Sequence, residues 1–223
     1  DGNGAVDRID VTMTAEASIS CTFQLADWSI PTAGTVIGAN TPSACAVFGN
    51  DIQVTVAALA DKTGGGTSPT INYSNVAPKG SVSDAGNLNQ APSFAAPVTA
   101  TDGAKPIFLT ATTGDNDADG TVDRLVMTFS EAVTVTDGGT DDDITLTASS
   151  GTATVTAGAY GAVGTTTLTY VISVSATSNT AITVTPTYAT GGAGSISDTV
   201  NEMLNTETVT GTDGAAPYLV SAT

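Results

Sequence analysis

The nine-residue stretch DNDADGTVD, which begins at Asp115, carries aspartates at its first, third, fifth and ninth positions and a glycine at its sixth. Carboxylates this close repel one another unless a cation lies between them. Calcium takes six to eight oxygen ligands in flexible geometry, and alternate carboxylates around a glycine turn can supply them. The pattern therefore predicts a calcium site made by Asp115, Asp117, Asp119 and Asp123, with the backbone carbonyl of Thr121 as a further ligand.

The residue that follows this stretch at the twelfth position, and one alternative interpretation, bear on that prediction. An EF-hand requires a glutamate at the twelfth position, which Val126 occupies here, so the flanking elements need not be helices. The alternative to a calcium site is a solvated Asp/Gly turn that joins two strands.

The N-terminus repeats the second half of the pattern. Asp1, Asn3 and Asp7 occupy the positions of Asp117, Asp119 and Asp123. The counterpart of Asp115 is missing from the sequence, so a second calcium site here needs an oxygen from another segment. A calcium site and a simple turn both remain open for this half-loop.

A third acidic stretch, TDGGTDDDIT, contains Asp137, Asp141, Asp142 and Asp143. Adjacent side chains of an extended backbone point in opposite directions and seldom converge on one ion. We therefore favour a solvated turn, with a metal loop as the alternative. Asp10, Glu16 and Glu131 lie on or beside predicted strands, and each could lend a carboxylate.

Composition excludes several classes of function. The chain has no histidine, so Ser-His-Asp and Cys-His catalysis are impossible, and no G-x-S-x-G elbow or phosphate-binding loop occurs. We predict that it is not an enzyme. Five basic residues stand against 22 acidic ones, for a net charge of −17, which excludes nucleic acid as a partner. No apolar run approaches the roughly 20 residues of a membrane span.

Short runs such as IDVTM, LVMTF, ITLTA and AITVTPTY alternate β-branched or apolar residues with polar ones, and turn residues separate them. Period-two alternation is typical of half-buried strands, and no long segment shows the 3.6-residue period of a helix. The sequence thus predicts an all-β fold.

The two cysteines, Cys21 and Cys45, lack the spacing of a four-ligand zinc site, and no histidine is available to complete one. A disulfide between them is the favoured interpretation, and two buried free thiols are the alternative. A disulfide would place the protein in an oxidising, extracellular compartment.

The chain contains two divergent copies of one module. DGNGAVDRIDVTM from Asp1 aligns with DADGTVDRLVMTF from Asp117, GSVSDAGNLN from Gly80 with GSISDTVNEMLN from Gly194, and VTATDGAKPIFLTAT from Val98 with VTGTDGAAPYLVSAT from Val209. Self-similarity at this spacing indicates tandem domains. We predict a first domain over residues 1–101, a second over 102–212, and a spare opening strand over 213–223.

The boundaries of the two copies do not coincide with the ends of the sequence. The first copy lacks the opening strand that KPIFLTAT provides in the second, and PYLVSAT repeats that strand at residues 217–223. An open sheet edge is a template for another strand. We expect Tyr218, Leu219 and Val220 to contact the first domain of another copy, head to tail. One period of a longer continuous chain would produce the same arrangement.

The order KPIFLTAT, acidic loop, VDRLVMTFSEAV and SISDTVNEMLN resembles the bacterial Ig-like modules of surface-layer proteins and large adhesins. The second copy fits this pattern better than the first, which has MTAEAS in place of FSEAV. The acidic loop is similar to the D-x-D-x-D-G-x-x-D calcium loops of integrin-type propellers.

The resemblance implies two tandem Ig-like β-sandwich domains in a calcium-stabilised structural protein of the cell surface, a surface layer or a secreted filament. The alternative is an adhesin or carbohydrate-binding module that recognises a glycan or another cell-surface ligand through its loops.

Overall fold

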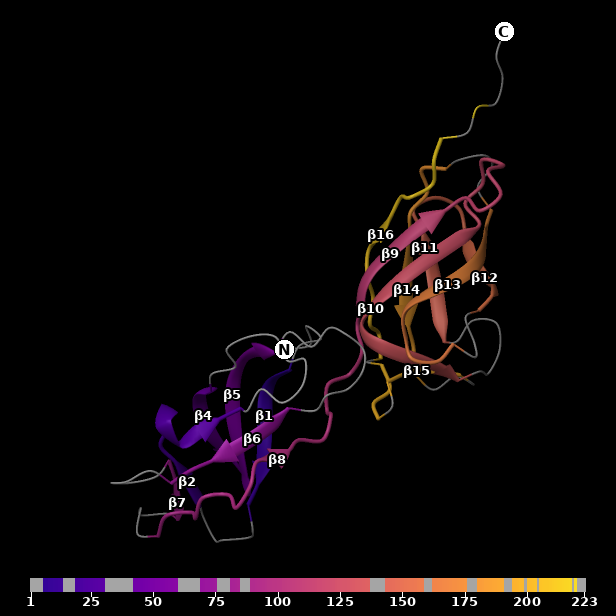
Figure 1. Cartoon of the computed structure of the whole chain (residues 1–223). Helices are drawn as coiled ribbons and strands as arrows, with labels where there is room; N and C mark the ends of the chain where they lie inside the picture. The colour runs from indigo at the N-terminus through magenta and orange to yellow at the C-terminus, as the bar shows by residue number, and fades with distance from the viewer. Residues whose placement is uncertain are drawn as a thin grey trace. The chain divides into compact units, whose positions relative to one another are not determined.

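The computed structural model describes residues 6–13, 19–30, 42–59, 69–75, 81–84, 89–136, 143–158, 162–175, 180–190, 194–198, 200–203, 205–217 and 219 (Figure 1). Within this part of the chain, the regular elements are strands and one turn of 3₁₀ helix, Leu25–Asp27. The predicted all-β fold is therefore confirmed. Asp1, Asn3, Tyr218 and Val220 lie outside the described residues.

The chain divides into two compact units. The first unit consists mainly of Ala5–Asp61 and Gly66–Asp102, and the second mainly of Gly103–Thr223. Each unit contains its own cluster of buried apolar side chains. Each therefore has the hydrophobic core that a separately folding unit requires.

The first unit contains three small antiparallel sheets. Their orders are β1-β5-β4, β3-β6-β8 and β2-β7. The strands are β1 (Val6–Thr12), β2 (Ile19–Cys21), β3 (Trp28–Ser29), β4 (Pro42–Phe48), β5 (Asp51–Leu59), β6 (Thr70–Tyr73), β7 (Val82–Asp84) and β8 (Val98–Thr99). Trp28, Ile52 and Tyr73 are among the side chains that fill the core between them.

The second unit is built on a larger sheet of order β12-β13-β10-β9-β16, with β15 also paired to β10 and a separate pair β11-β14. Its strands are β9 (Phe108–Gly114), β10 (Arg124–Thr136), β11 (Ile144–Ala148), β12 (Ala153–Ala157), β13 (Thr165–Val174), β14 (Val184–Tyr188), β15 (Ser195–Ser197) and β16 (Gly211–Thr212). Only β16, among these pairings, runs parallel to its neighbour β9. In β13, Leu168, Tyr170 and Ile172 are buried while the residues between them are exposed, as expected of a sheet with one face on the core.

The two units share a pairing pattern. In the first unit β1 pairs with β5 and β5 with β4, and in the second β10 pairs with β13 and β13 with β12, all antiparallel. The short strands β7 and β15 occupy corresponding places, because GSVSD and GSISD align in the sequence. The sequence repeat therefore has a counterpart in the strand order.

A buried tyrosine occurs at the same place in each unit. The Tyr73 hydroxyl accepts a hydrogen bond from the Val82 backbone N–H at 3.2 Å, and the Tyr188 hydroxyl accepts one from the Ile196 backbone N–H at 3.3 Å. Val82 and Ile196 are the matching residues of the two aligned motifs. The same side-chain contact therefore ties the same two segments together in both units.

The disulfide between Cys21 and Cys45 is confirmed, with the Cα atoms 6.1 Å apart. It joins β2 to β4 and so connects two sheets of the first unit. Cys21 lies opposite Val82, whereas in the second unit the buried Val135 lies opposite Ile196. A cysteine thus takes the place of a core valine, which explains why only the first unit carries the bridge.

Candidate functional site

The acidic stretch that begins at Asp115 is the connection of a β-hairpin. β9 and β10 pair antiparallel from Arg124 opposite Gly114, and the Asp123 backbone N–H donates to the Gly114 carbonyl at 3.0 Å. Within the connection, Gly120 has a φ of 88°. This left-handed conformation is open to glycine at little steric cost, so the glycine of the pattern allows the chain to turn back on itself.

Three of the four predicted carboxylate ligands converge. Asp115, Asp117 and Asp119 each place one carboxylate oxygen within 4.8 Å of the others. Backbone N–H groups of the same loop orient them: Gly120 donates to Asp115 Oδ2 at 2.8 Å, and Thr121 donates to Asp119 Oδ1 at 2.8 Å. Asp117 Oδ1 accepts a longer bond, 3.3 Å, from the Asp119 N–H.

The remaining predicted ligands are placed differently. Asp123 Oδ1 accepts a hydrogen bond from the Asn116 backbone N–H at 2.7 Å, which holds the two ends of the loop together, and Asp123 is not one of the three grouped carboxylates. Asp7, its counterpart in the first unit, lies in β1 and is partly buried. Asp143, in the third acidic stretch, has a φ of 61° next to β11, while Asp137, Asp141 and Asp142 lie outside the described residues.

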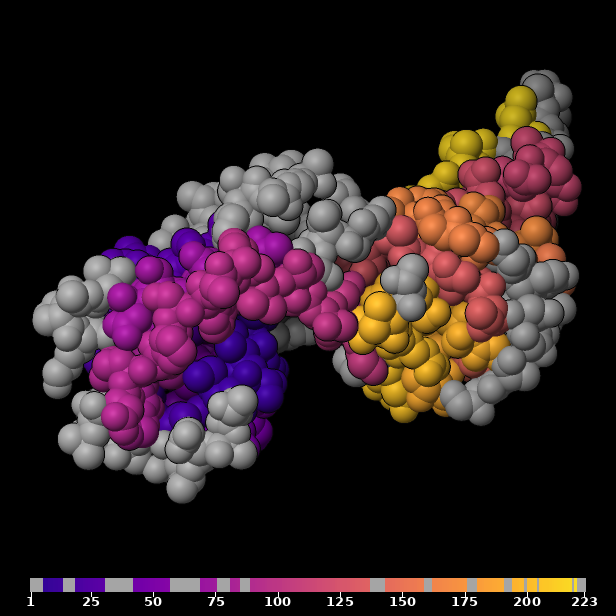
Figure 2. All heavy atoms as spheres, turned by 60° about the horizontal axis from the view of Figure 1, so that its bottom comes forward, coloured from indigo at the N-terminus to yellow at the C-terminus, as the bar shows by residue number. Residues whose placement is uncertain are grey.

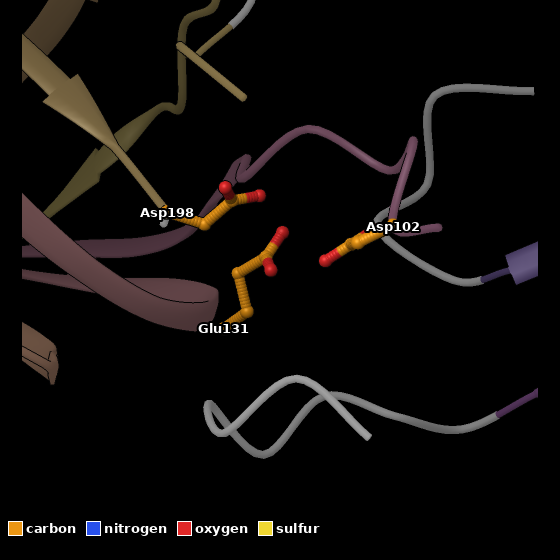
Figure 3. Close-up of side chains that lie close together, drawn as sticks. All are labelled: Asp102, Glu131 and Asp198. Carbon is orange, nitrogen blue, oxygen red and sulfur yellow. The ribbon is translucent and has the colours of Figure 1, made fainter. Parts of the chain in front are cut away.

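A second group of carboxylates consists of Asp102, Glu131 and Asp198 (Figure 3). One oxygen of each lies within 4.8 Å of the others. Of the described residues predicted to lend a carboxylate, Asp10 and Glu131, this group contains Glu131, and Glu16 lies outside the described residues. The other members of the group, Asp102 and Asp198, were not predicted. Both belong to segments that the repeat had marked, TDGAKP and SISDT, and this is the signal that could have found them.

Local hydrogen bonds position Asp198. It is buried, and its carboxylate accepts hydrogen bonds from the backbone N–H groups of Val200 and Asn201. The Asn201 side-chain amide donates to Asp198 Oδ2 at 3.2 Å and also to the Ala104 carbonyl at 3.0 Å. The turn after β15 is therefore attached to the segment that leads into β9.

Tyr188 supports the same turn from the core side. Its hydroxyl accepts from Ile196, two residues before Asp198, and donates to Glu202 Oε1 at 2.8 Å. Burial, followed by the hydrogen bond to the Glu202 carboxylate, raises the pKa of Tyr188 far above its ordinary value. Tyr188 therefore remains protonated at neutral pH and keeps donating to Glu202.

The donor atoms decide what such groups can do. Both carboxylate groups offer oxygen atoms only, without nitrogen or sulfur, and this donor chemistry suits hard cations such as calcium and magnesium. The hairpin group is the more exposed of the two, because Asp117 and Asp119 are exposed while Asp198 is buried. Within the described part of the chain, these are the two places where three acidic ligand atoms approach one another so closely.

Comparison with known proteins adds no relative. A scan against protein-family models, a search of curated proteins and a search of solved structures each returned no match. Among the described residues, no helix has the length and apolar character needed to cross a membrane. The function must therefore be inferred from the repeat, the loop and the disulfide.

Proposed function

We propose that this chain is a structural segment of an extracellular surface assembly, a filament, surface layer or adhesin stalk, built of calcium-stabilised Ig-like repeats joined head to tail. The observation that carries the proposal is that two successive units share the antiparallel pairing of three matching strands and the same buried tyrosine contact. Tandem repetition of a β module produces length and rigidity, which a structural role requires.

The chemistry of the chain favours a structural role over catalysis. Without histidine, a nucleophile would have no imidazole base. The converging carboxylates of the hairpin lie in an exposed turn, whereas the acid of a glycosidase needs a desolvated pocket to raise its pKa. Acidic turns of this kind stabilise a fold when a cation binds them.

Calcium is the proposed cation of the hairpin loop. Three converging carboxylates, already oriented by backbone N–H groups, need a positive charge to offset their repulsion. Calcium bound there would fix the connection between β9 and β10, and ligand binding to the folded state alone raises stability. The disulfide supports an extracellular location, since such bonds persist in oxidising compartments and calcium is abundant there.

The calcium proposal is tested by thermal unfolding in calcium and in chelator at low ionic strength. The native chain should melt at a lower temperature in chelator, and Asp119→Ala should abolish most of that difference. Asp141→Asn, which lowers the negative charge by the same amount in another acidic stretch, is the matched control and should respond like the native chain. A chelator that leaves the melting temperature unchanged contradicts the proposal, because the loop would then be only a turn.

The structural role itself is tested by electron microscopy of the purified chain in calcium. Filaments, sheets or rods are the results expected of a filament, a surface layer and a stalk respectively, and compact particles at every concentration would contradict the proposal.

One observation favours the alternative of a carbohydrate-binding module. Phe48, at the turn between β4 and β5, is 72% exposed. An exposed aromatic ring can stack on a sugar face. Selective binding on a glycan array that disappears in Phe48→Ala would move the protein into this second class.

A further inference from the structure

The described pairing of β1 in the first unit differs from that of β10 in the second. In the second unit β10 is paired on both sides, with β13 and with β9. Among the described residues of the first unit, the corresponding strand β1 pairs only with β5. Among these residues no strand pairs with the outer edge of β1, which corresponds to the β9 side of β10, and another strand can pair there.

The core beneath this edge is incompletely covered. Residues of β10 and its approach that face the core, Val122, Met127 and Phe129, are 0–2% exposed. Their counterparts in the aligned first copy are only partly buried: Val6, Val11 and Met13. Phe108 of β9 accounts for part of this difference in burial, because its ring packs against Phe129 with the ring centroids 5.3 Å apart.

In the second unit, β9 has a second neighbour besides β10. In the second unit β9 lies between β10 and β16, and β16 pairs with it in parallel, Gly211 opposite Ala111 and Thr212 opposite Thr112. The residues of the first unit that align with β16 are Ala100 and Thr101. The first unit thus contains sequence counterparts of both neighbours of β9, namely β10 and β16.

The chain itself contains a segment whose sequence suits a strand beside β1. After β16, TDGAAPYLVSAT repeats TDGAKPIFLTAT, the segment that leads into and forms most of β9. Pro106 is buried and Phe108 is 5% exposed, whereas their counterparts are Pro217, which is exposed, and Leu219, which is 76% exposed. In Figures 1 and 2 the yellow segment that follows β16 leaves the body of the second unit.

We propose that residues 217–223 of one copy form a strand that pairs antiparallel with β1 of a second copy, in the register that β9 adopts against β10. In that register Phe108 lies opposite Phe129 and Thr110 opposite Thr128. In the sequence alignment, the corresponding pairs are Leu219 opposite Met13 and Ser221 opposite Thr12. Leu219 then covers the partly buried Met13, as Phe108 covers Phe129.

This docking rests on the proposed function in one respect, that the partner is another copy of the same repeat. The donor segment and the acceptor edge are different surfaces, so the contact is head to tail and leaves a free donor and a free acceptor on each dimer. The product is an open-ended array whose joints are β-strand additions.

Site-directed cross-linking tests the register. The hydroxyls of Thr110 and Thr128 are hydrogen-bonded, so the corresponding positions 221 and 12 should lie within reach of a disulfide. Chains carrying Thr12→Cys are mixed with chains carrying Ser221→Cys and oxidised, while the native Cys21–Cys45 pair stays closed. We expect a mixed dimer that reduction releases. Ala222→Cys, whose side chain would point to the other face of the strand, should give little dimer with Thr12→Cys.

Sedimentation velocity tests the contribution of Leu219. Leu219→Asp should shift the chain towards monomer by at least tenfold in dissociation constant, because a charge would then be buried against Met13. Val163→Asp is the matched control, since Val163 is also 76% exposed but lies elsewhere on the second unit. Because both residues are exposed in the single chain, neither variant should prevent folding.

Failure of the docking is separable from failure of the proposed function. Absence of the cross-link, equal cross-linking at positions 221 and 222, or equal assembly of Leu219→Asp and native chains would overturn the docking. None of these results bears on the calcium dependence of the melting temperature, which is measured on the single chain.

Discussion

At the residue scale, Glu207 shows how burial governs the charge of a single side chain. Burial raises the pKa of Glu207, although a hydrogen bond from the Phe108 backbone N–H lowers it in part. Ionisation of Glu207 is therefore less favourable in the folded than in the unfolded chain. Its contribution to stability is complete below the ordinary glutamate pKa and is lost as pH rises through the raised one.

Glu207→Gln should therefore raise the melting temperature slightly at neutral pH, because glutamine keeps the acceptor oxygen without the buried charge. The advantage should vanish as pH falls below the ordinary pKa of glutamate. Thermal unfolding of both chains across this pH range measures the difference, with Asp213→Asn as a control that removes one exposed charge. A gain that persists unchanged in acid would show that the pKa of Glu207 has no part in it.

At the scale of elements, buried polar contacts hold short strands that pair too briefly to be stable by themselves. β15 has three residues, β7 has three, and each is tied to the strand before it through a tyrosine hydroxyl. β10 is long enough to pair with three strands, with β13 and β9 along its first part and with β15 at its end. β10 therefore carries Glu131 itself. Its pairing with β15, together with the Tyr188 hydroxyl, positions the turn that carries Asp198.

Tyr188→Phe should destabilise the second unit by about 1–3 kcal/mol, the usual cost of leaving a buried hydrogen-bonding group, here the Ile196 N–H, without a partner. The Ile196 N–H and the Glu202 carboxylate would both lose the hydroxyl. Denaturant unfolding measures the change. Tyr73→Phe is the matched variant in the first unit, where the hydroxyl accepts from Val82, and it should cost less. Native stability in Tyr188→Phe would refute this account.

At the scale of the whole molecule, two separate cores predict two unfolding events. The disulfide lies within the first unit and connects two of its sheets, across a sequence separation of 24. Closing a loop of that length contributes about 3 kcal/mol by restricting the unfolded chain. The bridge therefore adds to the stability of the first unit and not to that of the second.

Reduction should lower one calorimetric transition and leave the other in place. Cys21→Ala together with Cys45→Ala should reproduce the effect without reductant, and reductant should not affect that variant further. A single transition that shifts as a whole on reduction would show that the two units unfold as one.

The local pattern of the sequence determined much of this protein. Alternation of apolar and polar residues predicted strands such as β10 and β11, because a strand's two faces follow from covalent geometry alone. The sequence favoured the Cys21–Cys45 disulfide over two free thiols, because zinc-site spacing and histidine are both absent, and the structure contains the bridge. The acidic loop was recognised because its carboxylates are close in sequence and a turn brings them close in space.

Only the tertiary structure decided which distant segments meet. Asp102, Glu131 and Asp198 come together because β10 pairs with β15 and because Asn201 binds the Ala104 carbonyl, and neither contact follows from local periodicity. The partial burial of Val11 on β1 and of Met13 just after it likewise has a reference only in the structure, where their counterparts Met127 and Phe129 are buried between paired strands. Which strands pair depends on the total apolar area that the pairing buries over the whole unit. This total is a property of the complete fold and cannot be read from one segment.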